Sequence, residues 1–265
     1  MADLQLAGKR ALITGGGSGI GRATARLLAE EGVSVGVVDI DDDAAEQVAS
    51  EISRSGAQAV FFQADVAEED QVARSIEAIT AKFGGLEILV NNAGIPGGPW
   101  TTLDQTDAER WERTMAVNLR AQQLYCRGVF PYLSRAGGAV VNNASSAALA
   151  GWPQAADYAV SKAGVVMLTR QLAAQWGRHG IRVNSVAPGI IDTGFGRGPA
   201  SRRQPPAPPA ERDLKYFPLG RVGHAEDVAS VILFLVSDMA RYVTGECILI
   251  DGGLLQMSYP ALLGR

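Results

Sequence analysis

The fold is indicated by one stretch of sequence, Thr14-Gly15-Gly16-Gly17-Ser18-Gly19-Ile20-Gly21. It begins at the end of a short apolar run, residues 11–14, which predicts a buried strand, and it precedes a helical pattern over residues 23–29. Glycine adopts positive φ and lets the backbone approach a ligand closely, and the N–H groups at the start of a helix attract a pyrophosphate. The spacing is G-x-x-x-G-x-G, so the G-x-G-x-x-G fingerprint is not met literally. The stretch predicts a strand, a phosphate-binding turn and a helix.

Outside this stretch, β-branched runs alternate with helical patterns almost to the end of the chain. Continuous apolar strands are typical of a parallel sheet with helices on both faces. We expect further strands at 33–39, 59–63, 88–91, 139–143, 183–186 and 247–250, and helices at 42–55, 68–83, 107–133, 157–176 and 225–236. A closed eightfold barrel is the alternative, but the glycine turn and the acid Asp39 after the second strand favour an open sheet. The predicted fold class is α/β: a Rossmann-type doubly wound parallel sheet of about seven strands, with residues 1–265 as a single domain.

The composition is that of a globular protein, with 47% hydrophobic and 20% charged residues in 265. A net charge of −4 provides no basic field for a nucleic-acid backbone, so we expect no nucleic-acid partner. The N-terminus lacks the apolar run of a signal peptide, and aliphatic runs such as residues 231–236 are too short to span a bilayer. We therefore expect a cytoplasmic protein without a membrane partner.

The cysteines and histidines give no sign of metal chemistry. Cys126 and Cys247 stand in apolar contexts and are expected to be buried, reduced thiols. His179 and His224 are isolated and match no metal-ligand spacing, so no metal site is predicted.

Residues 194–218 interrupt the pattern, because they contain six of the twelve prolines in the chain. Proline excludes a regular helix or a central strand, and a loop of this length in a compact domain is usually a lid or a disordered segment. The segment is predicted to be a flexible substrate-lid insertion.

Asp39 indicates which dinucleotide the glycine turn binds. It ends the second strand 20 positions after Gly19. An acid at this place accepts hydrogen bonds from the adenosine ribose hydroxyls and repels a 2′-phosphate. The following residues 40–43 add three aspartates, and no Arg or Lys lies within the turn or just after Asp39. The sequence therefore favours NAD(H) over NADP(H). Asp65-Val66, after the third strand, is read either as a contact to the adenine edge or as a turn acid.

Tyr158 and Lys162 are the candidate catalytic pair. Residues i and i+4 of a helix lie on one face, so the phenol and the ammonium can point into the same cleft. A nearby cation favours phenolate and is expected to lower the tyrosine pKa by roughly 1–3 units from about 10. That change would bring the phenol toward the range useful for proton transfer near neutral pH.

Several motifs in a fixed order resemble the short-chain dehydrogenase/reductase family over nearly the whole chain. They are Thr14-Gly15-x-x-x-Gly19-x-Gly21, Asn91-Asn92-Ala93-Gly94, Asn118, Ser145, Tyr158-x-x-x-Lys162 and Pro188-Gly189. The resemblance implies that Tyr158 exchanges a proton with the carbonyl or alcohol oxygen and that Lys162 holds the nicotinamide ribose and acidifies Tyr158. It implies that Ser145, thirteen residues before Tyr158, bonds the reacting oxygen in preference to Ser146. Asn118 would hold a water that links Lys162 to solvent.

The same resemblance implies a full set of site residues. The catalytic set is Asn118, Ser145, Tyr158 and Lys162. The cofactor set is Gly15, Gly17, Ser18, Gly19, Ile20, Gly21, Asp39, Ile40, Asp65, Val66, Asn92, Ala93, Gly94, Tyr158, Lys162, Pro188, Gly189, Ile191 and Thr193. The substrate pocket is expected at Ile95, Ser145, Trp152 and Phe195.

The predicted function is therefore NAD-dependent hydride transfer between nicotinamide and a secondary alcohol or ketone, with a small cyclic or aromatic compound favoured by the apolar pocket candidates. The resemblance also implies a homotetramer. Two alternatives remain at this point. One is an S-adenosylmethionine-dependent methyltransferase, which uses a similar turn and acid but needs no Ser, Tyr and Lys set. The other is a nicotinamide-binding sensor of the same fold without catalysis.

Overall fold

The computed structural model describes residues 4–99, 101–195, 214 and 217–257. Its centre is a seven-stranded sheet in the order β3-β2-β1-β4-β5-β6-β9, with every neighbouring pair parallel. The strands of this sheet are β1 (Arg10–Thr14), β2 (Ser34–Asp39), β3 (Ala59–Gln63), β4 (Ile88–Asn91), β5 (Gly138–Asn143), β6 (Ile181–Pro188) and β9 (Cys247–Ile250). The predicted seven-stranded, doubly wound α/β fold is confirmed.

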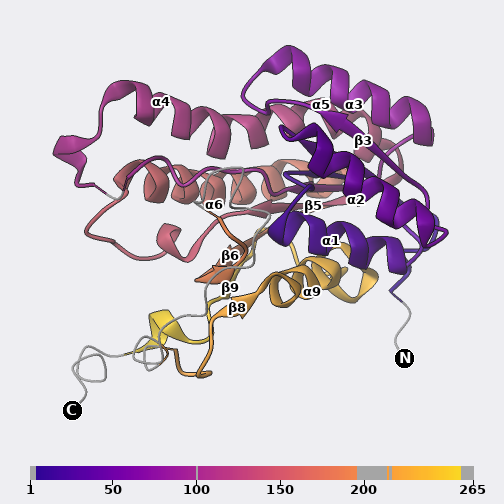
Figure 1. Ribbon diagram of the computed structural model, residues 1–265. Coiled ribbons are helices and arrows are strands. Elements are labelled where there is room, and N and C mark those ends of the chain that lie inside the picture. The colour runs from indigo at the N-terminus through magenta and orange to yellow at the C-terminus, as the bar shows by residue number, and fades with distance from the viewer. Residues whose placement is uncertain (1–3, 100, 196–213, 215–216, 258–265) are drawn as a thin grey trace.

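Helices cover both faces of the sheet, as Figure 1 shows. They are α1 (Gly19–Glu30), α2 (Asp42–Arg54), α3 (Glu69–Phe83), α4 (Ala108–Met115), α5 (Ala121–Ala136), α6 (Ala156–Trp176) and α9 (Ala225–Val236). One buried apolar cluster joins α1, α2 and α9 to the sheet, and a second joins α3 and α5 to the opposite face. The inner strands β1, β2, β4, β5 and β6 are almost fully buried, which is why their sequences are largely apolar, whereas the edge strands β3 and β9 are only partly buried.

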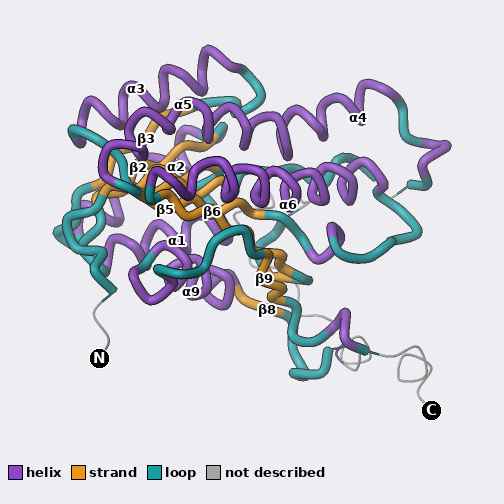
Figure 2. The backbone as a smooth tube through the Cα atoms, turned by 180° about the vertical axis from the view of Figure 1, so that it is seen from behind, coloured by secondary structure: helices purple, strands orange, loops and turns teal. Residues whose placement is uncertain are grey.

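The strand order changes direction between β1 and β4, which are neighbours although α1, β2, α2, β3 and α3 separate them in sequence. In an open α/β sheet, a crevice forms outside the carboxyl ends of the strands at such a switch point. The glycine turn follows β1, and Asn92 follows β4, so both segments lie at this crevice. Figure 2 shows the same layers from behind.

Three details differ from the sequence-based expectation. The helix predicted over 107–133 is interrupted: α4 and α5 are separated by a π-helical turn, Ala116–Arg120. A second, two-stranded sheet pairs β7 (Ile191–Asp192) with β8 (Gly223–His224). Cys247 is only partly buried, in contrast to Cys126.

Most of the predicted substrate lid, 194–218, lies outside the described residues.

Candidate active site

A cavity of about 400 Å³ lies at the carboxyl ends of the strands. Its walls include residues at or just after the ends of β1 to β6, as expected for the switch-point crevice. The structure brings these predicted residues together in the cavity wall: Gly15, Ser18, Gly19, Ile20, Asp39, Ile40, Asp65, Val66, Asn92, Ala93, Gly94, Ile95, Ser145, Trp152, Tyr158, Lys162, Pro188, Gly189, Ile191, Thr193 and Phe195. Gly17, Gly21 and Asn118 do not line the cavity, and their contacts show what they do instead.

The glycine turn is held in shape by close backbone contacts. Gly15 has a φ of 62°, which favours glycine. A Cβ on Gly21 would lie 2.0 Å from the carbonyl oxygen of Gly15, so a side chain there would displace the turn. Gly21 therefore packs against the turn without lining the cavity, while Ser18, Gly19 and Ile20 line it. The first amides of α1 have no partner within the helix and suit the pyrophosphate of a dinucleotide.

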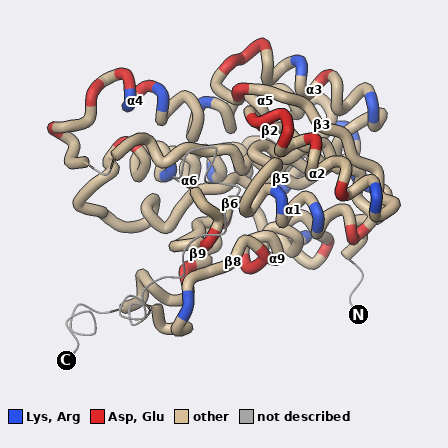
Figure 3. The backbone as a smooth tube through the Cα atoms, in the orientation of Figure 1, with Lys and Arg blue, Asp and Glu red and all other residues tan. Residues whose placement is uncertain are grey.

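Asp39 is fixed at the end of β2 by two backbone donors. The Gly17 N–H donates to Oδ2 at 2.9 Å and the Asp41 N–H donates to Oδ1 at 3.1 Å. The side chain is 7% exposed and lines the cavity. Figure 3 shows the acidic run beside the end of β2 in red. The carboxylate is therefore oriented next to the glycine turn, where an adenosine ribose would bind.

Asp65 is held by Arg113, which no motif in the sequence indicates as a site residue. Arg113 of α4 donates through Nη2 to Asp65 Oδ2 at 2.8 Å, and Arg113 also lines the cavity. The Ala67 N–H donates to Asp65 Oδ1 at 3.0 Å, which is the turn-acid contact. Asp65 therefore makes a turn contact and lines the cavity at the same time.

The segment after β4 is tied to the glycine turn. Thr14 Oγ1 accepts the N–H groups of Asn92 and Ala93 at 3.0 and 3.1 Å, and Asn92 Nδ2 donates to the Gly15 carbonyl at 2.9 Å. Asn91, by contrast, points into the core, where its Nδ2 donates to Asn142 Oδ1. These bonds join the two halves of the sheet across the switch point.

Ser145, Tyr158 and Lys162 meet in the cavity from two elements, the segment after β5 and helix α6. Burial raises the pKa of Tyr158, and its hydrogen bond with Ser145 acts in the opposite direction. The net direction is opposite to the lowering of the tyrosine pKa expected from the nearby ammonium. Ser146 also lines the cavity, but Ser145 is the serine whose interaction lowers the pKa of Tyr158.

Lys162 is a buried ammonium aimed at the cavity. It is 3% exposed, and Nζ donates to the Asn143 carbonyl oxygen at 2.7 Å. Nζ lies 5.9 Å from the centre of the Tyr158 ring. Burial lowers the pKa of Lys162 to about 8. An ammonium has three donors, so this geometry suits additional oxygen acceptors such as ribose hydroxyls.

Asn118 lies in the π-helical turn and joins three segments. Its Nδ2 donates to the Ile95 carbonyl at 2.9 Å and to Ser161 Oγ at 3.1 Å, and its Oδ1 accepts the Ile95 N–H at 2.8 Å. A Cβ on Gly94 would lie 3.3 Å from Asn118 Oδ1 and 3.4 Å from Lys162 Nζ. The side-chain amide thus holds the segment after β4 against α6, beside the lysine.

The far end of the cavity is largely apolar. Ile95, Trp152 and Phe195 line the cavity, together with Pro96, Ala147, Gln154, Ala155 and Ile190. The Phe195 ring centre lies 6.1 Å from that of Tyr158, with the rings tilted by 50°. An apolar compartment therefore adjoins the phenol.

In the described part of the chain, no three His, Cys, Asp or Glu side chains gather as a metal site. Among the same residues, no helix has the length and apolarity needed to cross a membrane.

Comparisons with known proteins cover most of the chain. A family model described as enoyl-(acyl carrier protein) reductase matches residues 15–255. The chain is 41% identical over 244 residues to 2-(S)-hydroxypropyl-CoM dehydrogenase 3 of Xanthobacter autotrophicus, which covers 91% of this chain and 94% of that protein. It is 41% identical to cyclohexanol dehydrogenase of an Acinetobacter species, over 92% of this chain and 94% of that protein.

Among solved structures, a 3-ketoacyl-(acyl-carrier-protein) reductase from Brucella melitensis, complexed with NADH, superposes with a TM-score of 0.85 at 34% identity, over 94% of this chain and 99% of that chain. The named relatives are dehydrogenases and reductases, which excludes the methyltransferase alternative. The chain therefore belongs to the short-chain dehydrogenase/reductase family, oxidoreductases that act on CH–OH or C=O groups.

Proposed function

We propose that this protein is an NAD(H)-dependent dehydrogenase that interconverts a small cyclic or aromatic secondary alcohol and its ketone, with Tyr158 as the acid/base. The observation that carries the proposal is that one cavity joins the glycine turn and Asp39 at one end to Ser145, Tyr158 and Lys162 at the other. The cavity therefore has both the nucleotide-binding groups and the proton-transfer groups that the reaction requires.

The residues present fit a nicotinamide dinucleotide. The turn before α1 presents helix N-terminal amides, Asp39 is oriented to accept ribose hydroxyls, and Lys162 has donors directed to the cavity. When bound, the dinucleotide supplies or accepts the hydride. Asp39 supports NAD(H), because a 2′-phosphate would lie next to a carboxylate that Gly17 and Asp41 hold in place.

Tyr158 is suited to give a proton to a ketone oxygen. Its phenol is neutral near pH 7, because burial raises its pKa, and Ser145 is bonded to it. Ser145 can therefore bond the same substrate oxygen and hold it beside the phenol. In the direction of alcohol oxidation the phenol must lose its proton, and the Lys162 ammonium favours the phenolate that remains.

The apolar far end of the cavity supports a compact, neutral substrate. Trp152, Phe195 and Ile95 present hydrocarbon and aromatic surface to the cavity, and Phe195 lies beside the Tyr158 ring. An uncharged ring buries its apolar surface there, whereas a charged group would lose its hydration. The cyclohexanol dehydrogenase relative supports the same class of substrate.

The role of Tyr158 is tested by Tyr158→Phe in an assay of NADH oxidation with cyclohexanone, 4-phenyl-2-butanone and acetophenone. We expect turnover to fall by at least about 100-fold, because the general acid is removed, while quenching of tryptophan fluorescence by NADH is unchanged. Tyr242→Phe is the matched control, since Tyr242 is fully exposed and outside the cavity. A fully active Tyr158→Phe variant would overturn the proposal, and an inactive wild type that still binds NADH would favour the sensor alternative.

The choice of cofactor is tested by comparing kcat/KM for NADH and NADPH. The repulsion between Asp39 and a 2′-phosphate predicts a preference of about 100-fold for NADH. Asp39→Asn keeps an oxygen acceptor for the Gly17 N–H but removes the charge, so the preference should shrink by about tenfold or more. Equal use of both cofactors by the wild type would refute the assignment to NAD(H).

A further inference from the structure

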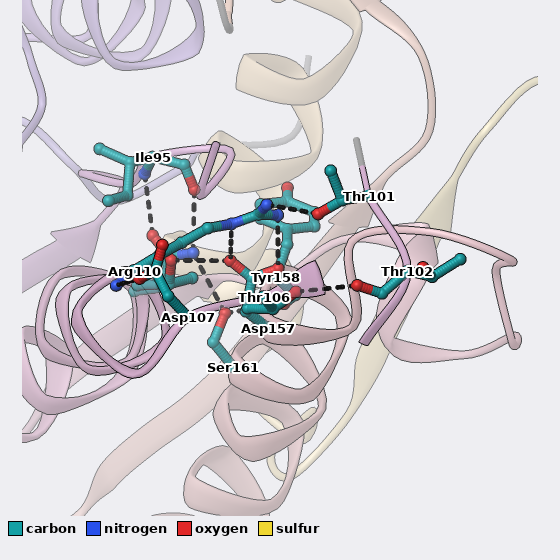
Figure 4. Close-up of polar contacts among 11 residues, drawn as sticks. Ile95, Thr101, Thr102, Thr106, Asp107, Arg110, Asp157, Tyr158 and Ser161 are labelled. Carbon is teal, nitrogen blue, oxygen red and sulfur yellow. Dashed lines mark hydrogen bonds and ion pairs between the residues drawn. The ribbon is translucent and has the colours of Figure 1, made fainter. Parts of the chain in front are cut away.

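Asp157, the residue before Tyr158, is a buried carboxylate with three hydrogen-bond donors from α4. Arg110 donates to it through Nε and Nη2 at 2.9 and 3.0 Å, and Thr114 Oγ1 donates at 3.0 Å (Figure 4). The carboxylate is 0% exposed and the Arg110 side chain is 11% exposed. Two-point contact between a guanidinium and a carboxylate fixes both distance and direction. The first turn of α6 is therefore fastened to α4.

The same arginine reaches a third segment. Arg110 Nη1 donates to Thr101 Oγ1 at 2.7 Å, and the Ala155 N–H donates to the Thr101 carbonyl at 3.0 Å. Figure 4 shows Thr101, Arg110 and Asp157 converging from three parts of the chain. A Cβ on Gly97 would lie 2.3 Å from Asp157 Oδ2, so the segment after β4 also fits closely around the carboxylate.

Helix α6 begins without a side-chain cap, as α1 and α3 do, but it alone of these three begins after a residue other than glycine with a positive φ. Helices α2 and α4 are instead capped by Asp41 and Asp107, whose side chains accept N–H groups of the first helical turn. The residue before α6 is Ala155, whose side chain cannot accept a hydrogen bond from the first turn of the helix. Its backbone has φ 59° and ψ 47°, a left-handed conformation that residues other than glycine rarely adopt. The start of the helix that carries Tyr158 is thus determined by tertiary contacts.

Neither Arg110 nor Asp157 lines the cavity, whereas the residues that they fix do. Ala155 directly precedes the fastened turn and Tyr158 lies within it, and both line the cavity. A displacement of that turn would move the phenol relative to Ser145, which comes from a different element, the segment after β5. Proton transfer depends on the distance between such groups, and a misplacement of 1 Å lowers rates by about 100-fold.

We propose that Arg110 and Asp157 are a positioning pair for catalysis: by clamping the uncapped start of α6 to α4, they hold the Tyr158 phenol in register with Ser145. The inference rests on the proposed role of Tyr158 as acid/base. A buried ion pair often adds little net stability, because desolvation of the two charges offsets their attraction.

The test separates positioning from stability with three variants: Arg110→Met, Asp157→Asn and the double variant. Each single variant leaves a buried charge unpaired, so its urea midpoint should fall well below that of the wild type. The double variant removes both charges, so its midpoint should return toward that of the wild type. Its kcat with the most active ketone of the panel should nevertheless stay at least about tenfold low. Its Kd for NADH should change by less than the fall in kcat, since the glycine turn and Asp39 lie on other elements.

A double variant that regains both the wild-type midpoint and the wild-type kcat would overturn the inference, because the pair would then act on stability alone. Should the double variant fail to fold, Arg110→Lys decides: it retains the charge but loses the two-point contact, and a wild-type kcat in this variant overturns the inference equally. Arg74→Met is the matched control, since Arg74 pairs with Asp70 on the exposed face of α3. Loss of turnover in Tyr158→Phe together with full activity in these variants would reject the positioning role and leave the proposed function standing.

Discussion

Replacement of Lys162 by methionine is expected to change how the stability of the protein depends on pH. Burial lowers the pKa of Lys162 from 10.5 to about 8. Between these two values the unfolded chain binds the proton while the folded chain does not, so wild-type stability rises with pH in this window. Below about pH 8 both states are protonated, and the full penalty of a buried ammonium is present. Methionine fills a similar volume and cannot titrate.

The magnitude follows from the shift. Each pKa unit corresponds to 1.36 kcal/mol, and pH 7 to 10 spans about two units of the window, which gives about 3 kcal/mol. The free energy of unfolding of the wild type, relative to that of Lys162→Met, should therefore rise by about that amount between pH 7 and pH 10.

The measurement is urea unfolding without cofactor, followed by tryptophan fluorescence at several pH values. All other titrating groups are common to both proteins and cancel in the difference. Lys82→Met, at an exposed position near the end of α3, is the control and should follow the wild-type pH dependence. A Lys162→Met curve parallel to that of the wild type across this range would refute the reasoning, because it would show that the folded protein does not depress the lysine pKa.

Two further predictions concern the glycine turn and the thiols. Gly21→Ala should weaken NADH binding by about tenfold or more and destabilise the fold by about 1–3 kcal/mol, because the added Cβ meets the Gly15 carbonyl oxygen; fluorescence titration and urea unfolding check both, and wild-type affinity would contradict the role of Gly21. At pH 8, a thiol reagent should label Cys247 before Cys126, since Cys126 is buried and burial raises its pKa to about 12. Mass spectrometry of digested protein would identify the labelled residue, and earlier labelling of Cys126 would contradict its burial.

The fold was predictable from sequence because each buried strand of a parallel sheet appears as a short, continuous apolar run. Both faces of strands such as β4 are buried, so their apolar runs mark them directly, and β3, β4, α9 and β9 begin and end where the sequence predicts. The π-helical turn was not predictable, because Ala116–Arg120 contains no glycine or proline, and its extra residue is accommodated by the contacts of Asn118 with Ile95 and Ser161.

The candidate site divides in the same way. Tyr158 and Lys162 are one helical turn apart, so their shared face follows from sequence spacing alone. Arg110 and Asp157 are separated by 47 positions, and no local signal identifies a partner at that distance. The effect of burial on the Tyr158 pKa was missed for a related reason: spacing indicates that a cation is near, but desolvation depends on every element packed around the phenol.

The parallel pairing of β1 with β4 has a consequence for synthesis on the ribosome. Ala11 pairs with Ile88, so β1 leaves the exit tunnel long before its second neighbour, β4, has been translated. During that interval the nascent chain presents an unpaired, apolar strand edge of the kind that aggregates and that chaperones shield. The glycine turn is translated before the strand that ends at Pro188, so the pocket that both line stays incomplete until that strand has been made and folded.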